Sequence, residues 1–465
     1  MANNENRSML SQFLSKLFGR SAPAQPAAEA QKRDFEQLNA LAPVADATAA
    51  SDTAEMARSF LCREAVLNAE QRVAGYEFQL RKAARDRVRV QSRRIHHVYN
   101  EVVVRNIVQF SIRKLLGHRL AFVPVLDSFL ASPVLRELPA QGVVLSVERV
   151  AGDEPDLAQV AGQARELREA GFALALEECF DGAHFDALAP LTDYFVVDTA
   201  RHSPAEIKAL VGRLAEANGR AAMVARDLES YDDFTLCQKL GFRLFQGPFI
   251  TSREDWTANQ VGPQGLRVCD LLNRLRRDAE TAELAKILRQ DAVLSYRLLR
   301  YVNSAASGLR QKITSIEHAL VMMGRAKLYR WLTLLLFGSA QSVPGAAALL
   351  ENALVRGRLM ELAGQARLKP ADQDSLFVTG LFSMLDLVLR VPLAEALRPI
   401  QLPEEIPAAL LRREGPYAPY LELALACESF DQDRITAASA LCGLDAATVN
   451  ERHIEAITWV QDIDL

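Results

Sequence analysis

The sequence lacks long apolar runs, paired cysteines and any strong excess of charge. No stretch approaches the roughly 18 consecutive apolar residues of a membrane span. Residues 1–14 carry polar side chains where a secretory signal would have a continuous apolar segment. The six cysteines include no C-x-x-C pair, which indicates reduced thiols rather than a disulfide frame or a zinc site. A formal net charge of −4 gives no global field that attracts nucleic acid. We therefore expect a cytoplasmic protein.

Residues 1–57 differ in pattern from the rest of the chain. Apolar side chains at helical spacing within residues 9–18, with Lys16 and Arg20 nearby, predict a short amphipathic helix. Such a helix can touch a membrane surface or a partner, although we favour a tail helix without that contact. The Ala-rich, Pro-containing run that follows predicts a flexible tether.

Residues 58–252 carry short apolar runs of strand length, separated by helical patterns. The runs cover residues 60–66, 73–80, 121–125, 142–147, 172–176, 194–198, 221–225 and 242–246. The first two predict an opening hairpin, and the others predict parallel strands with right-handed crossovers. This strand count favours a TIM-like barrel, in which chemistry lies at the C-terminal strand ends.

The chain changes character after residue 252. Residues 253–265 contain a Gly-Pro-Gln-Gly run and predict a linker. Within residues 266–465, apolar side chains recur at three- and four-residue spacing, and strand patterns vanish. The predicted fold class is therefore α/β plus all-α, with a TIM-like barrel followed by a helical domain.

Three strand-end motifs resemble those of EAL domains. Residues 75–81 (GYEFQLR) look like the E-A-L-x-R strand, residues 191–198 (LTDYFVVD) like the A-D-x-I-K-x-D strand, and residues 240–249 (LGFRLFQGPF) like the closing strand. In the helical half, residues 289–304, 313–324 and 380–386 resemble segments of HDOD domains. The sequence is thus similar to two-domain EAL–HDOD signalling proteins over about 400 residues.

The resemblance to EAL domains implies cyclic di-GMP as a ligand. The family hydrolyses this dinucleotide with two divalent cations, Mg²⁺ or Mn²⁺, which take oxygen ligands at the barrel mouth. The residues that match family positions, and are candidates for binding cyclic di-GMP, are Glu77, Arg81, Asp198, Glu229 and Gln246.

Other family positions carry side chains that do not suit this chemistry. They are Pro124 for an asparagine, Ser146 and Arg149 for a glutamate and its companion, Val196 for the catalytic lysine, and Arg226 for a glutamate. A guanidinium about 4 Å from a divalent ion is repelled by roughly 8 kcal/mol at an effective dielectric near 20, so we expect Arg226 to swing away. The sequence therefore predicts no catalytic residue and no metal cofactor.

The acidic residues near the strand ends keep an enzymatic alternative open. Glu148 lies on the same strand face as Ser146 by alternation, and Glu177 with Glu178 replaces the family's paired aspartates with longer side chains. If the barrel is active, Mg²⁺ or Mn²⁺ is expected on a set of five carboxylates, namely Glu77, Glu148, Glu177, Glu178 and Asp198.

The helical half shows no hydrolytic motif. None of the seven histidines precedes an aspartate, as related metal-dependent phosphohydrolases require, and His318 sits in an apolar helical pattern typical of a core residue. The resemblance to HDOD domains implies docking of partner proteins. The basic segment 81–97 is most simply a solvated face, with a partner surface as an alternative; nucleic acid is not an expected partner.

We therefore predict a catalytically inactive signalling adaptor that acts through protein contacts of its HDOD domain. The first alternative is a divergent cyclic di-GMP phosphodiesterase. The second is a receptor that binds cyclic di-GMP weakly without hydrolysis.

Overall fold

The computed structural model describes nine segments of the chain. They are residues 61–80, 93–109, 119–149, 156–178, 180–251, 260–303, 313–338, 345–429 and 431–461. Several predicted features lie outside these segments: the amphipathic helix of residues 9–18 and the tether after it, Arg81, most of the basic segment 81–97, and residues 253–259 of the linker.

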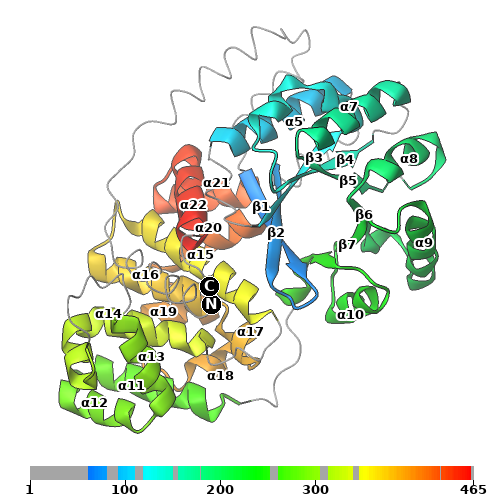
Figure 1. The fold of residues 1–465 in the computed structure, drawn as a ribbon. Helices are drawn as coiled ribbons and strands as arrows, with labels where there is room; N and C mark the ends of the chain where they lie inside the picture. Colours follow the sequence, from blue (N-terminus) through cyan, green and yellow to red (C-terminus); the bar gives the residue numbers. More distant parts are fainter. Residues whose placement is uncertain are drawn as a thin grey trace.

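The N-terminal half is a closed eight-stranded barrel in which the strands follow one another in sequence order (Figure 1). Strand β1 pairs antiparallel with β2 and with β8, and the remaining neighbours are parallel. The strands are β1 (Leu61–Asn68), β2 (Val73–Leu80), β3 (Leu120–Leu126), β4 (Val143–Glu148), β5 (Ala173–Glu177), β6 (Tyr194–Asp198), β7 (Ala222–Arg226) and β8 (Leu244–Gln246). The predicted opening hairpin is confirmed as β1 and β2.

In the described part of this half, the helices lie on the outside of the barrel (Figure 1). They are α5 (Arg93–Gln109), α7 (Leu157–Glu169), α8 (Gly182–Leu188), α9 (Pro204–Ala217) and α10 (Tyr231–Lys239). Local sequence sets where several of them begin. Asp156 accepts hydrogen bonds from two backbone amides of α7, while Ser203 and Ser230 form capping boxes at α9 and α10.

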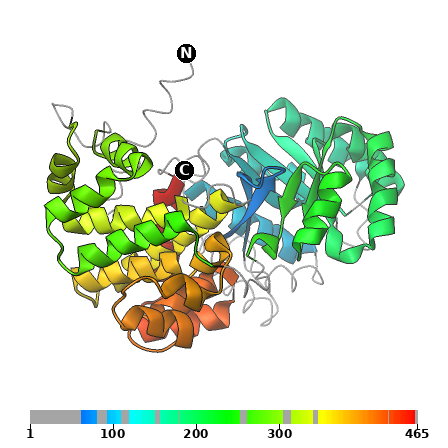
Figure 2. The same cartoon turned by 90° about the horizontal axis from the view of Figure 1, so that it is seen from below.

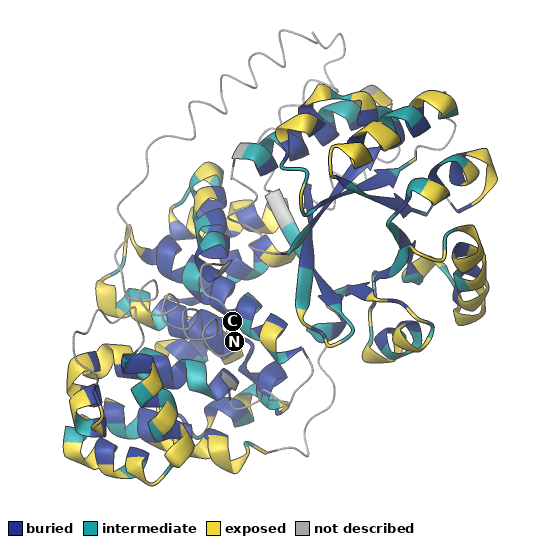
Figure 3. Cartoon of the chain, viewed as in Figure 1, coloured by how far each residue is buried: buried dark blue, intermediate teal, exposed yellow. Residues whose placement is uncertain are grey.

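Alternation along the strands gives the barrel two apolar regions. Val66, Phe122, Val144, Val196 and Val224 belong to a cluster formed by alternate strand positions, which fills the interior. The intervening strand residues pack outward against the helices in the larger core. Figure 3 shows the strands buried and the outer faces of the surrounding helices exposed.

The C-terminal half is helical throughout the segments that the structure describes. Its α-helices are α11 (Pro263–Arg276), α12 (Thr281–Arg289), α13 (Ala292–Val302), α14 (Ile316–Gly338), α15 (Ala346–Gly364), α16 (Pro370–Phe382), α17 (Leu385–Leu389), α18 (Leu393–Leu397), α19 (Glu405–Pro407), α20 (Ala418–Ser429), α21 (Gln432–Cys442) and α22 (Ala446–Gln461). Helix α14 is interrupted at Gly324, whose backbone is not helical.

Helix α15 lies at the centre of the helical half and is buried along almost its whole length. It packs closely against α16 because Gly357 and Gly380 face each other: a Cβ atom on Gly380 would lie 2.5 Å from the Cα of Gly357. Figures 1 and 2 both place this half beside strands β1 and β2 of the barrel. The two halves therefore meet on the outside of the opening hairpin.

The predicted fold class is confirmed. The boundaries of the four predicted regions (1–57, 58–252, 253–265 and 266–465) stay predictions. Among the described residues, no helix has the length and apolar character needed to cross a bilayer. Of the six cysteines, Cys237, Cys269, Cys427 and Cys442 are buried free thiols.

Candidate functional site at the barrel mouth

Five polar side chains meet at the carboxyl ends of the barrel strands and are almost completely withdrawn from solvent. They are Glu77 on β2, Glu177 on β5, Asp198 on β6, Arg226 on β7 and Gln246 on β8, each less than 9% exposed. The last four are the final residues of their strands. Parallel strands end at one rim of a barrel, so side chains far apart in sequence converge there.

Arg226 holds two of the carboxylates together. Its Nη2 lies 3.2 Å from Oε2 of Glu77, and its Nη1 donates to Oε1 of Glu177. All three side chains are at most 5% exposed. Arg226 thus points into this group, because the two carboxylates attract its guanidinium. Its movement away from a bound divalent cation stays a prediction.

Gln246 joins a third carboxylate to the same group. Its Nε2 donates to Oε2 of Glu77 at 2.8 Å and to Oε2 of Glu64 at 3.0 Å. Glu64 lies opposite Glu77 in the β1–β2 pairing. Burial, followed by repulsion from Glu77, raises the pKa of Glu64 to about 7. Sequence motifs did not single out Glu64, although the hairpin register was a signal that could have found it.

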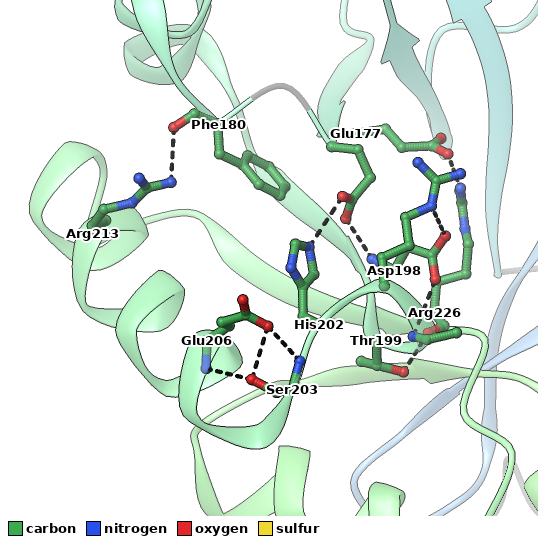
Figure 4. A network of polar contacts seen from close by, with 12 residues as sticks. Glu177, Phe180, Asp198, Thr199, His202, Ser203, Glu206, Arg213 and Arg226 are labelled. Atoms are coloured by element: carbon green, nitrogen blue, oxygen red, sulfur yellow. Dashed lines mark hydrogen bonds and ion pairs between the residues drawn. The ribbon is translucent and has the colours of Figure 1, made fainter.

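Asp198 is held by a second set of contacts on the neighbouring strand ends. Its Oδ2 lies 2.7 Å from Nε of Arg201, and its backbone N–H donates to Oε1 of Glu178 at 2.6 Å. Glu178 also lies 3.2 Å from Nε2 of His202. Figure 4 shows these contacts, with Asp198, His202 and Arg226 labelled.

The backbone beside this rim is unusual at two positions. Glu178 and Asp227, which follow β5 and β7 directly, have φ values of 49° and 56°. Residues such as glutamate seldom adopt this left-handed conformation, whereas aspartate does so more often. Glu178 is therefore the more strained of the two positions.

The side chains present do not fit a pair of divalent cations. Across the described segments, no group of three or more His, Cys, Asp or Glu side chains is arranged to hold a metal ion. Arg226 lies between Glu77 and Glu177, and Asp198 is paired with Arg201. Two hard cations need several converging oxygen ligands. Here the carboxylate oxygens are instead paired with guanidinium groups.

The remaining candidate residues lie at the edge of this group or outside it. Glu148 ends β4 and is half-buried, whereas Glu229 is exposed in the loop before α10. Ser146 is fully buried, and its hydroxyl has no hydrogen-bond partner in the described part of the chain. Whether any of these residues binds cyclic di-GMP stays a prediction.

Fold and rim together define the class: an α/β barrel with a charged rim, joined to a helical domain. A model of the HDOD domain family matches residues 267–397. The chain is 25% identical over 411 residues to "Cyclic di-GMP phosphodiesterase CdgJ" of Vibrio cholerae, covering 88% of this chain and 94% of that protein. It is 23% identical over 416 residues to the uncharacterized protein YuxH of Bacillus subtilis, covering 87% of this chain and 99% of that protein.

Among solved structures, the barrel is similar to the Bacillus subtilis YkuI protein, which has an EAL domain and was solved in complex with cyclic di-GMP and calcium. That match has 17% identity, a TM-score of 0.37, and covers 44% of this chain and 58% of the YkuI chain. The HDOD match and the two full-length relatives confirm that this chain resembles two-domain EAL–HDOD proteins.

One prediction is contradicted by these comparisons. The chain was expected not to be an enzyme, yet the relative that it matches over 94% of that protein's length is named a phosphodiesterase, at 25% identity. The expectation counted family positions with unsuitable side chains, such as Pro124 and Val196. Such a count does not measure activity, because neighbouring side chains can take over a missing role.

Proposed function

We propose that this chain transmits a cyclic di-GMP signal through protein contacts made by its HDOD domain. The supporting observation is that two helices that pack against each other, α13 and α14, each carry two exposed large apolar side chains. We call these four residues, Val293, Tyr296, Val321 and Met322, the α13–α14 surface.

The α13–α14 surface is unusual because large apolar side chains are normally withdrawn from water. Its four residues are 53%, 64%, 67% and 48% exposed, in the order given. The other exposed large hydrophobic residues in the described segments lie on four different elements. They are Tyr231, Leu266, Leu411 and Leu441. Exposed apolar groups that gather in one region are typical of sites for protein partners.

Photo-cross-linking tests this proposal. A photoreactive amino acid at position 321 should give a discrete cross-linked product in cells that produce the protein. A Tyr296→Asp substitution in the same chain should abolish the product. The matched control is position 441, where Leu441 is 68% exposed on α21. Equal products at both positions, or none at 321, would contradict the proposal.

A second candidate function is hydrolysis of cyclic di-GMP, which is favoured by the name of the Vibrio cholerae relative. It is compatible with the first, because the barrel rim and the α13–α14 surface lie in different domains. Hydrolysis would need Mg²⁺ or Mn²⁺, and the contacts of Arg226 with Glu77 and Glu177 would have to open first. Chromatography of cyclic di-GMP after incubation with each metal tests it. Turnover that is lost in Glu77→Gln would support it, and turnover unchanged in that variant would not.

Binding of cyclic di-GMP without hydrolysis is the third possibility. Calorimetric titration, with and without Mn²⁺, separates it from the second candidate. Heat of binding without product formation would favour a receptor.

A further inference from the structure

A second buried charge cluster, the Glu351 cluster, joins the barrel to the HDOD domain. Glu351, on α15, is 2% exposed and lies against three barrel side chains: Arg63, Tyr76 and Arg119. Arg119 donates to both carboxylate oxygens, at 3.1 and 2.9 Å, and Arg63 approaches Oε1 at 3.3 Å. The Tyr76 hydroxyl donates to the same Oε1.

The barrel side chains of this cluster also support one another. The guanidinium of Arg63 stacks over the Tyr76 ring, with its Cζ 4.1 Å from the ring centroid. Arg119 donates to the Tyr76 hydroxyl at 2.7 Å. Tyr76 is therefore the central contact of the cluster on the barrel side. A side chain that stacks on one arginine and bonds another has little freedom to move alone.

Because the Glu351 cluster is buried, its stability depends on every charged side chain in it. Desolvation lowers the pKa of Arg63 to about 10, partly opposed by Glu351, so the guanidinium stays charged at neutral pH. His453, on α22, is also buried, and desolvation together with Arg63 lowers its pKa to about 4. Removing one partner from a buried ion pair leaves an uncompensated charge, which is strongly unfavourable.

The same hairpin carries both charge clusters on its opposite faces. Successive residues of a strand point to opposite sides of the sheet. On β1, Arg63 points outward to Glu351 while Glu64 points inward to Gln246. On β2, Tyr76 points outward to Glu351, and Glu77 points inward to Arg226. Each pair is joined by a single peptide bond, so neither cluster can shift along the hairpin without moving the other.

We infer that the β1–β2 hairpin couples the barrel rim to the HDOD domain through the Glu351 cluster. A change in the partners of Glu77 alters the position of β2, and Tyr76 passes that displacement to α15. Helix α15 is the central helix of the HDOD domain, so it can transmit the change to the helices packed on it. The inference does not depend on which ligand, if any, binds at the rim.

Hydrogen-exchange mass spectrometry of the full-length chain tests the forward direction. The variants are Glu77→Gln on the hairpin and Glu178→Gln, a rim residue on another strand end whose carboxylate contacts Asp198 and His202. Exchange in residues 349–357 of α15 should become at least threefold faster in Glu77→Gln and change less than 1.5-fold in Glu178→Gln. Equal effects of the two variants, or no effect of either, would overturn the inference.

The reverse direction uses a matched pair on α15 itself. Glu351→Gln disturbs the cluster, whereas Glu361→Gln disturbs ion pairs with Arg330 and Arg358, which both lie in the helical half. Exchange in β7, which ends in Arg226, should accelerate at least threefold in the first variant and stay within 1.5-fold in the second. Because coupling between two sites is reciprocal, an effect in only one direction would also overturn the inference.

A milder variant covers the case in which Glu351→Gln unfolds. Tyr76→Phe removes one hydroxyl and leaves the aromatic ring under Arg63. It should accelerate exchange in both α15 and β7 by about twofold, whereas exchange that rises in α15 alone would identify a local packing effect and refute coupling. Neither readout uses cyclic di-GMP, so a failure here is distinct from a failure of the proposed function.

Discussion

The barrel rim and the Glu351 cluster are both buried groups of arginine and glutamate, with opposite charge balance. At the rim, Glu64, Glu77 and Glu177 surround one guanidinium, that of Arg226. In the Glu351 cluster, two guanidiniums, those of Arg63 and Arg119, share one carboxylate. Among these described side chains, the rim therefore has an excess of acid, and the interface has an excess of base.

The two groups relieve their excess charge by different chemistry. A carboxylate can take up a proton near neutral pH, and the pKa of Glu64 is raised to about 7 by burial and by Glu77. A guanidinium does not lose its proton in that range. The interface instead keeps its other basic group neutral, since burial and Arg63 lower the pKa of His453 to about 4. The rim can thus change its charge under physiological conditions, whereas the interface is fixed.

The largest expected effect comes from breaking the fixed cluster. Glu351→Ala leaves Arg63 and Arg119 buried without their shared carboxylate, so the free energy of unfolding should fall by about 3–5 kcal/mol. Denaturant titration followed by circular dichroism measures this change. The control is Glu395→Ala, which removes an exposed ion pair with Arg398 and should cost less than about 0.5 kcal/mol. Similar losses of unfolding free energy in the two variants would show that the buried cluster stabilises the fold no more than an exposed ion pair does.

The next effect is a pH dependence that only the rim should show. A carboxyl group whose pKa is raised on folding is protonated more readily in the folded state, so its contribution to stability is full below pH 4.5 and is lost as the pH rises to about 7. At about 1.4 kcal/mol per unit, this loss is at most about 3.5 kcal/mol. Glu64→Gln should remove this part of the pH dependence, so that the variant becomes more stable than the parent at pH 8.

Unfolding titrations at pH 5 and pH 8 measure this difference. The matched control is Glu101→Gln on α5, whose half-buried carboxylate pairs with Arg105 on the same helix. Its stability relative to the parent should be nearly the same at both pH values. A Glu64→Gln variant that is equally stabilised or destabilised at pH 5 and pH 8 would refute the assigned role of Glu64.

Local sequence patterns predicted the fold and part of the rim. Short apolar runs of strand length located the strands and their carboxyl ends, including Asp198 and Gln246, whereas Glu77 came from a family motif. These features depend on neighbours in sequence, which a pattern can report. The predicted hairpin also contains the information that Glu64 lies opposite Glu77, because its turn fixes the register of the two strands.

The partners of the arginines could not be predicted in this way. Arg226 meets Glu177 and Glu77 across the barrel, at separations of 49 and 149 residues. Glu351 meets Arg63 across 288 residues and two domains. Such pairs are fixed by how barrel closure and domain docking bring distant segments together, and neither leaves a local periodicity. The inward position of Arg226 could not be read from the sequence for this reason.

The smallest expected effect tests whether Arg226 alone keeps cations from the rim. Arg226→Glu replaces the guanidinium between Glu77 and Glu177 with a further carboxylate, so oxygen ligands should converge where positive charge now lies. Calorimetric titration with Mn²⁺ should show at least tenfold tighter binding than in the parent, a difference of about 1.4 kcal/mol. Arg220→Glu makes the same charge change at an exposed position before β7 and should leave Mn²⁺ affinity unchanged. If both variants gain equally, net charge explains the effect. If neither gains, Arg226 is not what excludes the metal, and the replacement of oxygen donors by Pro124 and Ser146 becomes the stronger explanation.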